Sequence, residues 1–326
     1  MSSKPAIKVE NLHRRFGDIL AVNGVSFEVD TGEVVGFIGE NGAGKTTTMR
    51  ILASLDYPSA GTAYVMGENV VNYTARVRSC LGWMPDSYGA YDNMTVVEYL
   101  DFFGRAIGFK TKERLQRVEE VMEFTDLTPL ADRLINKLSK GMGQRLCLGR
   151  ALIHDPDVLI LDEPAAGLDP KARVELKHLI RILADDGKTI LISSHILSEL
   201  GEMCDSLLFI NEGRIVHHGD AESLKRQSGA TATYSIEIAA EADPQTLNDW
   251  CAMAPLVKIL DMRKNGARVE IERDEEEVIS GTLRRMINDG LPIVEFRREE
   301  RNLEDAFIDM LGNSGAPVNL KAEGNN

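Results

Sequence analysis

Residues 39–46, GENGAGKT, constrain the fold most, because they match the pattern G-x-x-x-x-G-K-[ST]. They follow an apolar stretch with strand character and precede a helical pattern, the context in which such a loop wraps a phosphate chain. The alternative is an ordinary glycine turn ahead of a helix. We expect Lys45 to face the β- and γ-phosphates of a nucleoside triphosphate and Thr46 to ligate Mg²⁺. The residues expected to hold the nucleotide are Gly39, Asn41, Gly42, Ala43, Gly44, Lys45, Thr46 and Thr47.

A second acidic site is expected where another apolar run, residues 158–162, ends in Asp162 and Glu163. Asp162 is expected to hold Mg²⁺ directly or through water, and Glu163 to polarise the attacking water. Alone, such a pair is a weak signal, since acidic residues often begin helices, but with the glycine loop it indicates nucleotide hydrolysis. A GTPase would need an N-K-x-D base reader, and the nearest string, 136–139, lacks the aspartate.

The chain up to about residue 220 alternates short apolar runs with amphipathic stretches, which is typical of an α/β fold. Candidate strands cover residues 7–12, 33–39, 158–162, 189–193 and 206–210. The most apolar of them are expected in a parallel sheet that is covered on both faces. Residues 93–154 lack strand patterns and open with the capping-box spacing of Thr95 and Glu98, which predicts an α-helical insertion.

The composition changes at residues 228–233, SGATAT, which we interpret as a linker. Beyond it, the order strand, helix, strand, strand, helix, strand predicts a small α+β domain of ferredoxin-like type over 230–312, with a final helix at 303–311. Asn265 and Gly266 indicate a hairpin between the middle strands, because both positions of such a turn take positive φ. The tail, 313–326, is expected to be disordered.

Composition and charge exclude several classes of protein. The chain has 326 residues, and its hydrophobic share of 43% with 27% charged residues is that of a globular protein. A net charge of −14 disfavours a nucleic-acid binder, and four cysteines without a close pair disfavour disulfides and zinc. No apolar run reaches the ~18 residues of a membrane span, and the first residues lack the apolar core of a signal peptide, so a cytosolic chain is expected.

Three further motifs extend the two phosphate motifs: LSKGMGQR (138–145), AGLD (166–169) and SSH (193–195). All five, in this order, resemble the ATP-binding cassette (ABC) ATPases over roughly residues 5–222. The resemblance implies a P-loop NTPase core with an antiparallel β-subdomain and a helical subdomain at about 93–154. It also implies ATP and Mg²⁺ as cofactors, and two cassettes that close head-to-tail on two ATP molecules.

The resemblance implies roles for further residues. Phe16 would stack on adenine, the alternative being a core phenylalanine at the end of a strand. Ser139 and Gly141 would contact the γ-phosphate that is bound by the partner cassette. Asp169 would cross the dimer seam, and simple N-capping of a helix is its alternative. His195 would reach the γ-phosphate and hold the attacking water.

The chain departs from the family pattern at three positions. Asp86 stands where the family has the Gln whose side-chain oxygen meets Mg²⁺ and the water. An aspartate keeps an oxygen there but adds a negative charge close to the phosphates. Lys140 replaces a glycine of the LSKGMGQR segment and Met142 replaces its Gln. We expect this segment to work, and Asp86 to affect coupling more than hydrolysis.

Residues 193–205 and 303–311 further resemble the nucleotide-binding subunits of exporters whose permease is a separate chain. The resemblance implies an ATP-hydrolysing subunit that is peripheral on the cytoplasmic face of the cell membrane. Its partners would be a membrane permease and a second cassette, identical or different, and no nucleic acid. The alternatives are a soluble cassette ATPase acting on DNA or ribosomes, and a cassette that serves as a switch for a regulatory C-terminal domain.

An aromatic cluster lies where the Asp86 segment meets the helical insertion. In the resembling family, this region receives a short cytoplasmic helix of the permease, and aromatic anchors suit such a contact. Members at helical spacing are expected to face inward, whereas those in the preceding loop are expected to be exposed for docking. The first group is Tyr99, Phe102 and Phe103, the second is Tyr88 and Tyr91, and Trp83 precedes both.

Overall fold

The computed structural model describes residues 4–86, 89, 91, 93–196, 200, 203–220, 232–272 and 275–299. Its contacts divide the chain into two compact units, Met1–Asp220 and Ala221–Asn326. Each unit has a hydrophobic core of its own. Most of the expected linker, the helix expected at 303–311 and the tail lie outside the described residues.

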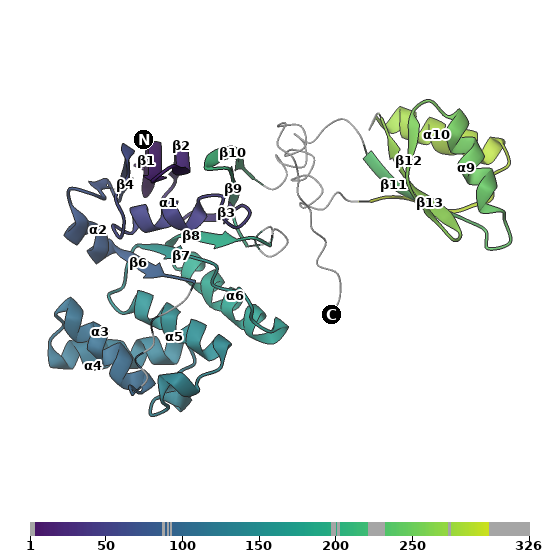
Figure 1. Ribbon diagram of the computed structural model, residues 1–326. Coiled ribbons are helices and arrows are strands. Elements are labelled where there is room, and N and C mark those ends of the chain that lie inside the picture. The colour runs from purple at the N-terminus through teal and green to yellow at the C-terminus, as the bar shows by residue number, and fades with distance from the viewer. Residues whose placement is uncertain are drawn as a thin grey trace. The chain divides into compact units, whose positions relative to one another are not determined.

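A six-stranded sheet in the order β10-β9-β3-β8-β7-β6 forms the centre of the first unit (Figure 1). All its pairs are parallel except the edge pair of β9 and β10. Every residue of β3, β7 and β8 is buried, because both faces of the sheet are covered. The strands are β3 (Val34–Ile38), β6 (Leu81–Met84), β7 (Val158–Leu161), β8 (Thr189–Ser194), β9 (Ser206–Asn211) and β10 (Arg214–Gly219).

An antiparallel sheet in the order β2-β1-β4-β5 belongs to the same unit. Its strands are β1 (Ile7–Phe16), β2 (Ile19–Val29), β4 (Ala60–Val65) and β5 (Glu68–Asn69). One hydrophobic core joins it to the central sheet, with α1 (Lys45–Leu52) contributing Met49 and α2 (Thr74–Cys80) contributing Val77. The strand expected at 7–12 extends to Phe16, because pairing with β2 continues to the tight turn at Gly17.

Residues 93–154 are all described and form helices, with one isolated β-bridge between Thr95 and Leu134. The predicted capping box is present: the Thr95 N–H donates to the Glu98 carboxylate at 2.8 Å, and the Glu98 N–H donates to the Thr95 hydroxyl at 3.3 Å. The helices are α3 (Val96–Ile107), α4 (Thr111–Phe124) and α5 (Lys140–Leu152), with the 3-10 turns η1 (Thr128–Leu130) and η2 (Ile135–Lys137). Beyond β7, α6 (Pro170–Asp185) returns the chain to β8.

The aromatic cluster is only partly oriented as expected. Tyr99 is fully buried, and its ring lies 4.9 Å from that of Phe103. Phe102 is 43% exposed, so the prediction that it faces inward is wrong. Adjacent helix positions diverge by about 100°, so Phe102 points away from the buried stripe of α3 that contains Tyr99, and Phe103 is half-buried. Tyr91 is 51% exposed, as expected, and Tyr88 lies outside the described residues.

The second unit confirms the ferredoxin-like order. Its antiparallel sheet has the order β12-β13-β11-β14. Leu247 of the first helix and Met286 of the second pack with the sheet in one core. In chain order, the elements are β11 (Ala232–Ile238), α9 (Pro244–Met253), β12 (Val257–Arg263), β13 (Gly266–Ile271), α10 (Glu276–Asn288) and β14 (Ile293–Arg298).

The hairpin between β12 and β13 forms, but not for the expected reason. Arg263 pairs with Gly266, so the turn consists of Lys264 and Asn265, and neither has a positive φ. Gly266 is already part of the strand. A Cβ there would collide with the carbonyl oxygen of Ile236 on β11. Close approach of the neighbouring strand, rather than turn geometry, requires this glycine.

Candidate active site

The loop between β3 and α1 needs its glycines for two different reasons. A Cβ on Gly39 would collide with the Ile210 carbonyl oxygen of β9. Gly44 has φ 109°, and a Cβ there would lie 2.5 Å from the Ala21 carbonyl oxygen of β2. Gly44 is also the N-cap residue of α1. Because glycine has no side chain, it cannot accept a hydrogen bond from the first backbone N–H groups of the helix. The loop is therefore shaped to present backbone N–H groups to an anion.

Lys45 is the buried cation of this loop, with 5% of the residue exposed. Its Nζ donates to the carbonyl oxygens of Gly39 at 2.7 Å and Glu40 at 3.3 Å, and lies 3.4 Å from Oε1 of Glu163. The lysine thus joins the glycine loop to the end of β7. It supplies one positive charge where a phosphate chain on the loop would lie.

Asp162 follows β7 and is 1% exposed. The Ser193 hydroxyl donates to its Oδ1 at 2.8 Å. Burial raises the pKa of the Asp162 carboxyl, while hydrogen bonds from Ser193 and Thr46 act in the opposite direction. A divalent cation would compensate for the lost hydration of this carboxylate, and the Thr46 hydroxyl is close enough to share it. These two oxygen donors fit Mg²⁺, which uses one or two carboxylates and completes its shell with water and phosphates.

Glu163 is held in place at three points. Its backbone has φ +49°, a left-handed conformation that is rare outside glycine, and its N–H donates to the Ser193 hydroxyl at 2.8 Å. Its Oε2 lies 2.8 Å from Nδ1 of His195, and its Oε1 faces Lys45. The structure therefore brings together Lys45, the adjacent pair Asp162 and Glu163, and His195, from three segments that are far apart in the sequence.

Ser193 is the residue that sequence reasoning missed. It is fully buried at the end of β8, and its hydroxyl accepts from Glu163 while it donates to Asp162. The available signal was its place in the SSH motif, beside the end of the neighbouring strand β7. Only strand pairing shows that its hydroxyl bridges both acidic residues.

Ser193→Ala is expected to lower both thermal stability and ATP turnover. The change leaves the Glu163 N–H without its acceptor and removes one of the two side-chain hydrogen bonds to Asp162, and an unpaired buried group costs about 1–3 kcal/mol. The matched control is Ser194→Ala, whose hydroxyl accepts from the Ile196 N–H instead and should affect turnover less. Melting curves and steady-state ATPase rates measure both effects. Parent-like values for Ser193→Ala would contradict the bridging role.

The residues of the LSKGMGQR and AGLD motifs form a second group, at the starts of α5 and α6. Ser139 is the N-cap of α5 and accepts from the Met142 N–H at 3.4 Å, and Asp169 caps α6 by accepting from the Ala172 N–H at 2.9 Å. A Cβ on Gly141 would lie 2.9 Å from the Cβ of Ala172, so the two helix starts adjoin. Among the described residues, no hydrogen bond or ion pair joins Ser139 or Asp169 to the Lys45 cluster.

Two other expected site residues stand at strand ends. Phe16 is 45% exposed at the end of β1, so the alternative of a core phenylalanine is wrong. Asp86 follows β6, and its backbone carbonyl accepts from the buried Gln144 amide of α5 at 3.5 Å. The Asp86 segment is thus tied to the helix that begins at Ser139. Asn41, Gly42, Ala43 and Thr47 complete the loop and the start of α1.

Known proteins resemble the chain in sequence and in fold. The family model of the ABC transporter matches residues 22–166. Nod factor export ATP-binding protein I of Burkholderia lata is 38% identical over 307 residues, which cover 94% of this chain and 97% of that protein. ABC transporter ATP-binding protein NatA of Bacillus subtilis is 40% identical over 67% of this chain and 91% of its own length.

A solved structure of an ATP-binding subunit of an ABC transporter superposes with a TM-score of 0.62 at 29% identity. It covers 68% of this chain and 92% of its own. The match thus extends over about two thirds of the chain, and the first compact unit, Met1–Asp220, makes up a similar share of it. Sequence similarity that spans nearly the whole of an export ATP-binding protein and the shared cassette fold show that the chain belongs to the ATP-binding proteins of ABC transporters, which are ATPases.

Proposed function

We propose that this chain hydrolyses ATP to power an exporter whose membrane permease is a separate chain. The contact of Glu163 with both Lys45 and His195, beside the buried Asp162, carries the proposal. The similarity to a Nod factor export protein supports the exporter part. Among the described residues, no helix has the length and apolar character needed to cross a membrane. The proposed location is peripheral, on the cytoplasmic face, through contact with the permease.

In the proposed reaction, Glu163 accepts the proton of the water that attacks the γ-phosphate. His195 Nδ1 holds the Glu163 carboxylate at 2.8 Å, and its ring orients the water with it. Lys45 binds the β- and γ-phosphates, and the loop N–H groups bind the rest of the phosphate chain. Thr46 and Asp162 would hold Mg²⁺, with Asp86 at its edge. When bound, the ion supplies positive charge that stabilises the transferring phosphoryl group.

We also propose that two cassettes, identical or different, complete each other's sites. Ser139 and Gly141 would offer a hydroxyl and a helix N-terminus to the γ-phosphate held by the partner, with Asp169 at the seam. Among the described residues, neither Ser139 nor Asp169 is joined to the Lys45 cluster of its own chain by a hydrogen bond or ion pair, which supports this arrangement. ATP-dependent dimer formation, followed by size-exclusion chromatography, tests it.

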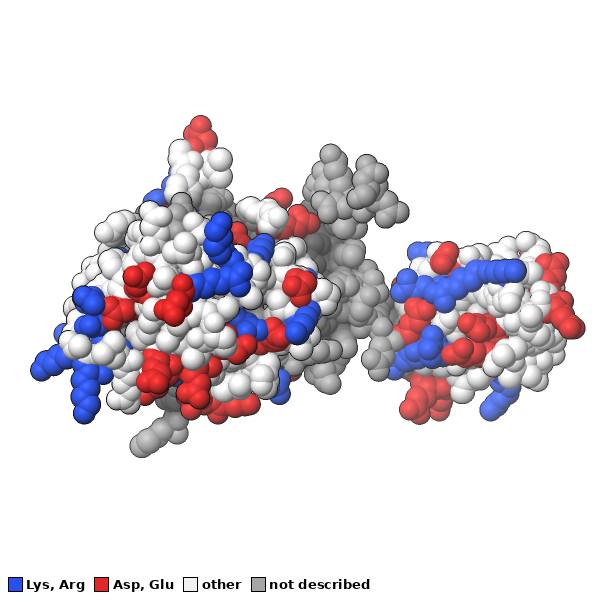
Figure 2. All heavy atoms as spheres, turned by 90° about the horizontal axis from the view of Figure 1, so that it is seen from below, with Lys and Arg blue, Asp and Glu red and all other residues white. Residues whose placement is uncertain are grey.

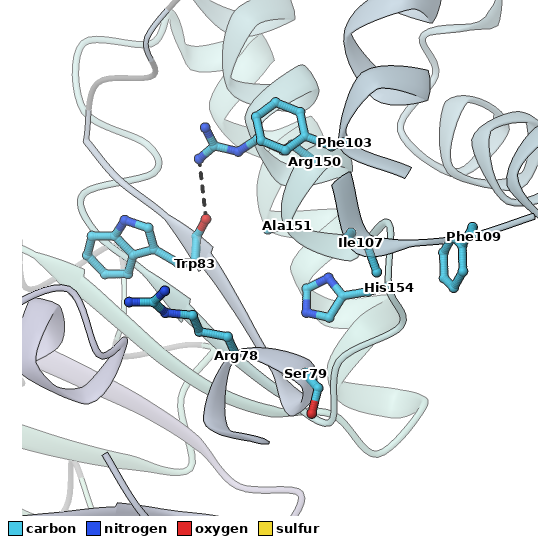
Figure 3. A pocket seen from close by; sticks show the side chains of 9 residues that line it. All are labelled: Arg78, Ser79, Trp83, Phe103, Ile107, Phe109, Arg150, Ala151 and His154. Atoms are coloured by element: carbon cyan, nitrogen blue, oxygen red, sulfur yellow. Dashed lines mark hydrogen bonds between the residues drawn. The ribbon is translucent and has the colours of Figure 1, made fainter. Parts of the chain in front are cut away.

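A groove of about 490 Å³ is the proposed docking site for the permease (Figure 3). It lies between α2 and β6 on one side and α3 and α5 on the other. Arg78 and Arg150 contribute guanidinium groups, which donate to the carbonyl oxygens of Ser54 at 2.6 Å and Trp83 at 3.4 Å and have no carboxylate partner among the described residues. A permease helix with an apolar anchor and a carboxylate would suit it. The groove is lined by Arg78, Ser79, Trp83, Phe103, Ile107, Phe109, Arg150, Ala151 and His154.

Ile107→Glu is expected to abolish co-purification with the permease while basal ATPase activity persists. Ile107 is 45% exposed in the groove, and a glutamate there would neutralise the cationic lining and repel an acidic partner. The matched control is Leu115→Glu on α4, which is 55% exposed but outside the groove lining. Equal permease recovery with both variants would place the docking site elsewhere.

The ferredoxin-like unit is proposed as an accessory domain of about residues 230–312, outside the cassette of 5–222. Every residue assigned above to ATP or to the permease lies in the first unit. Acidic and basic side chains intermingle on the face shown in Figure 2, and the described residues on this face form no broad basic surface for a polyanion.

Co-purification with the membrane partner and cargo-dependent ATPase rates are the central test of the proposed function. If the chain hydrolyses ATP but neither binds a permease nor responds to one, the result would favour the alternative of a soluble cassette that serves as a switch for a regulatory C-terminal domain.

A further inference from the structure

Phe16 does not stand alone at the end of β1. The guanidinium carbon of Arg14 lies 4.3 Å from the centre of the Phe16 ring. The two residues are two positions apart on the same strand, so their side chains project from the same face. The arginine covers one face of the ring, and a planar ligand can therefore stack only on the other.

A carboxylate from another segment holds this arginine. Oδ1 of Asp56, between α1 and β4, lies 2.8 Å from Nη2 of Arg14 and also accepts from the Tyr57 N–H at 2.8 Å. The Arg14 and Asp56 side chains are only 23% and 16% exposed. The buried Nε of Arg14 has no hydrogen-bond partner among the described residues. The carboxylate and the ring thus position the guanidinium, although its Nε makes no hydrogen bond among the described residues.

The position of the ring suits the base of a nucleotide on the phosphate loop. Phe16 pairs with Ile19 across the β1–β2 turn. Ala21, two residues farther along β2, touches the loop at Gly44. Two strand residues span about 7 Å, a distance that a ribose and its first phosphate can bridge.

We propose that Arg14, anchored by Asp56, is a positioning residue that fixes Phe16 as the platform for the base of ATP. This inference rests on the proposed function and on the stacking of adenine on Phe16 that the resemblance to the ABC ATPases implies. The cation attracts the ring through its quadrupole and restricts its rotamers. Less side-chain freedom is then lost when the base stacks, which is how preorganisation raises affinity.

The test compares the parent with Arg14→Ala, Phe16→Ala and the double variant in binding of two probes, ATP and inorganic tripolyphosphate, each with Mg²⁺. Arg14→Ala is expected to weaken ATP binding roughly two- to fivefold, the range of a cation–π contact. Tripolyphosphate binding should not change, because this probe has no base. In the Phe16→Ala background, Arg14→Ala should add nothing further, since it acts through the ring.

Arg76→Ala is the matched control, because Arg76 also contacts both an aromatic ring and a carboxylate. Arg76 lies on α2, outside the site, 5.3 Å from the centre of the Tyr73 ring and 3.0 Å from the Glu68 carboxylate. This control should leave both affinities unchanged. Asp56→Asn releases the same arginine with a smaller change in shape, and it replaces Arg14→Ala if that variant does not fold. It is expected to weaken ATP binding in the same direction.

The outcomes separate this inference from the proposed function. If Phe16→Ala weakens ATP binding but Arg14→Ala and Asp56→Asn do not, the positioning role is overturned and the base platform stands. If Phe16→Ala leaves ATP affinity unchanged, the platform and the positioning role both fail. Weaker tripolyphosphate binding by Arg14→Ala would overturn the inference, because the arginine would then act on the phosphates or on the fold.

Discussion

Glu163→Gln is expected to lower ATP turnover by about 10²–10⁴-fold, the usual contribution of a positioned general base, while ATP binding persists. The amide has nearly the shape of the carboxylate and can still meet His195, but it cannot accept the proton of water. It also removes the negative charge that lies 3.4 Å from Lys45 Nζ, so the lysine remains available to bind phosphate. Single-turnover and steady-state hydrolysis measure the first effect, and nucleotide titration measures the second.

The same variant should accumulate as an ATP-dependent dimer, because ATP that is bound more tightly by the paired cassettes than by one cassette stabilises the pair until it is hydrolysed. Glu119→Gln, an isosteric change at an exposed position of α4, is the control and should behave like the parent. Near-parental turnover in a clean preparation of Glu163→Gln would remove Glu163 from its proposed role.

Lys45→Ala is expected to weaken ATP binding itself by on the order of 10- to 100-fold, the value of a hydrogen bond to a charged group. Lys45 is the buried cation of the loop, and its Nζ is already turned toward the loop carbonyls and Glu163. Lys45→Met keeps most of the side-chain volume and tests the charge alone, so both variants should lose affinity together. Calorimetric titration with ATP is the measurement. Parental affinity with lost hydrolysis would mean that the lysine acts only in the transition state.

Local sequence determined much of this protein. The glycine loop was placed correctly between a strand and a helix, because its spacing is set by contacts within a few residues. The apolar runs of β3, β7 and β8 predicted their burial, since a strand covered on both faces has no polar alternation. The order of elements in the second unit likewise predicted its ferredoxin-like sheet.

Other features depended on which distant segments meet. Ser193 bridges Asp162 and Glu163 only because β8 lies beside β7, and no pattern around the serine encodes that neighbour. Gly266 is required by the approach of β11, although its sequence neighbours suggested a turn.

Asp56 reaches Arg14 from a segment 42 positions away, and the burial of Tyr99 but not Phe102 follows from what packs against α3. The sequence by itself thus determined the most apolar strands, the helical insertion, the order of elements in the second unit and the chemical groups of the site, because these follow from short-range spacing. Only the tertiary structure decided which of those groups touch, because contacts between distant segments depend on how the sheets and helices pack.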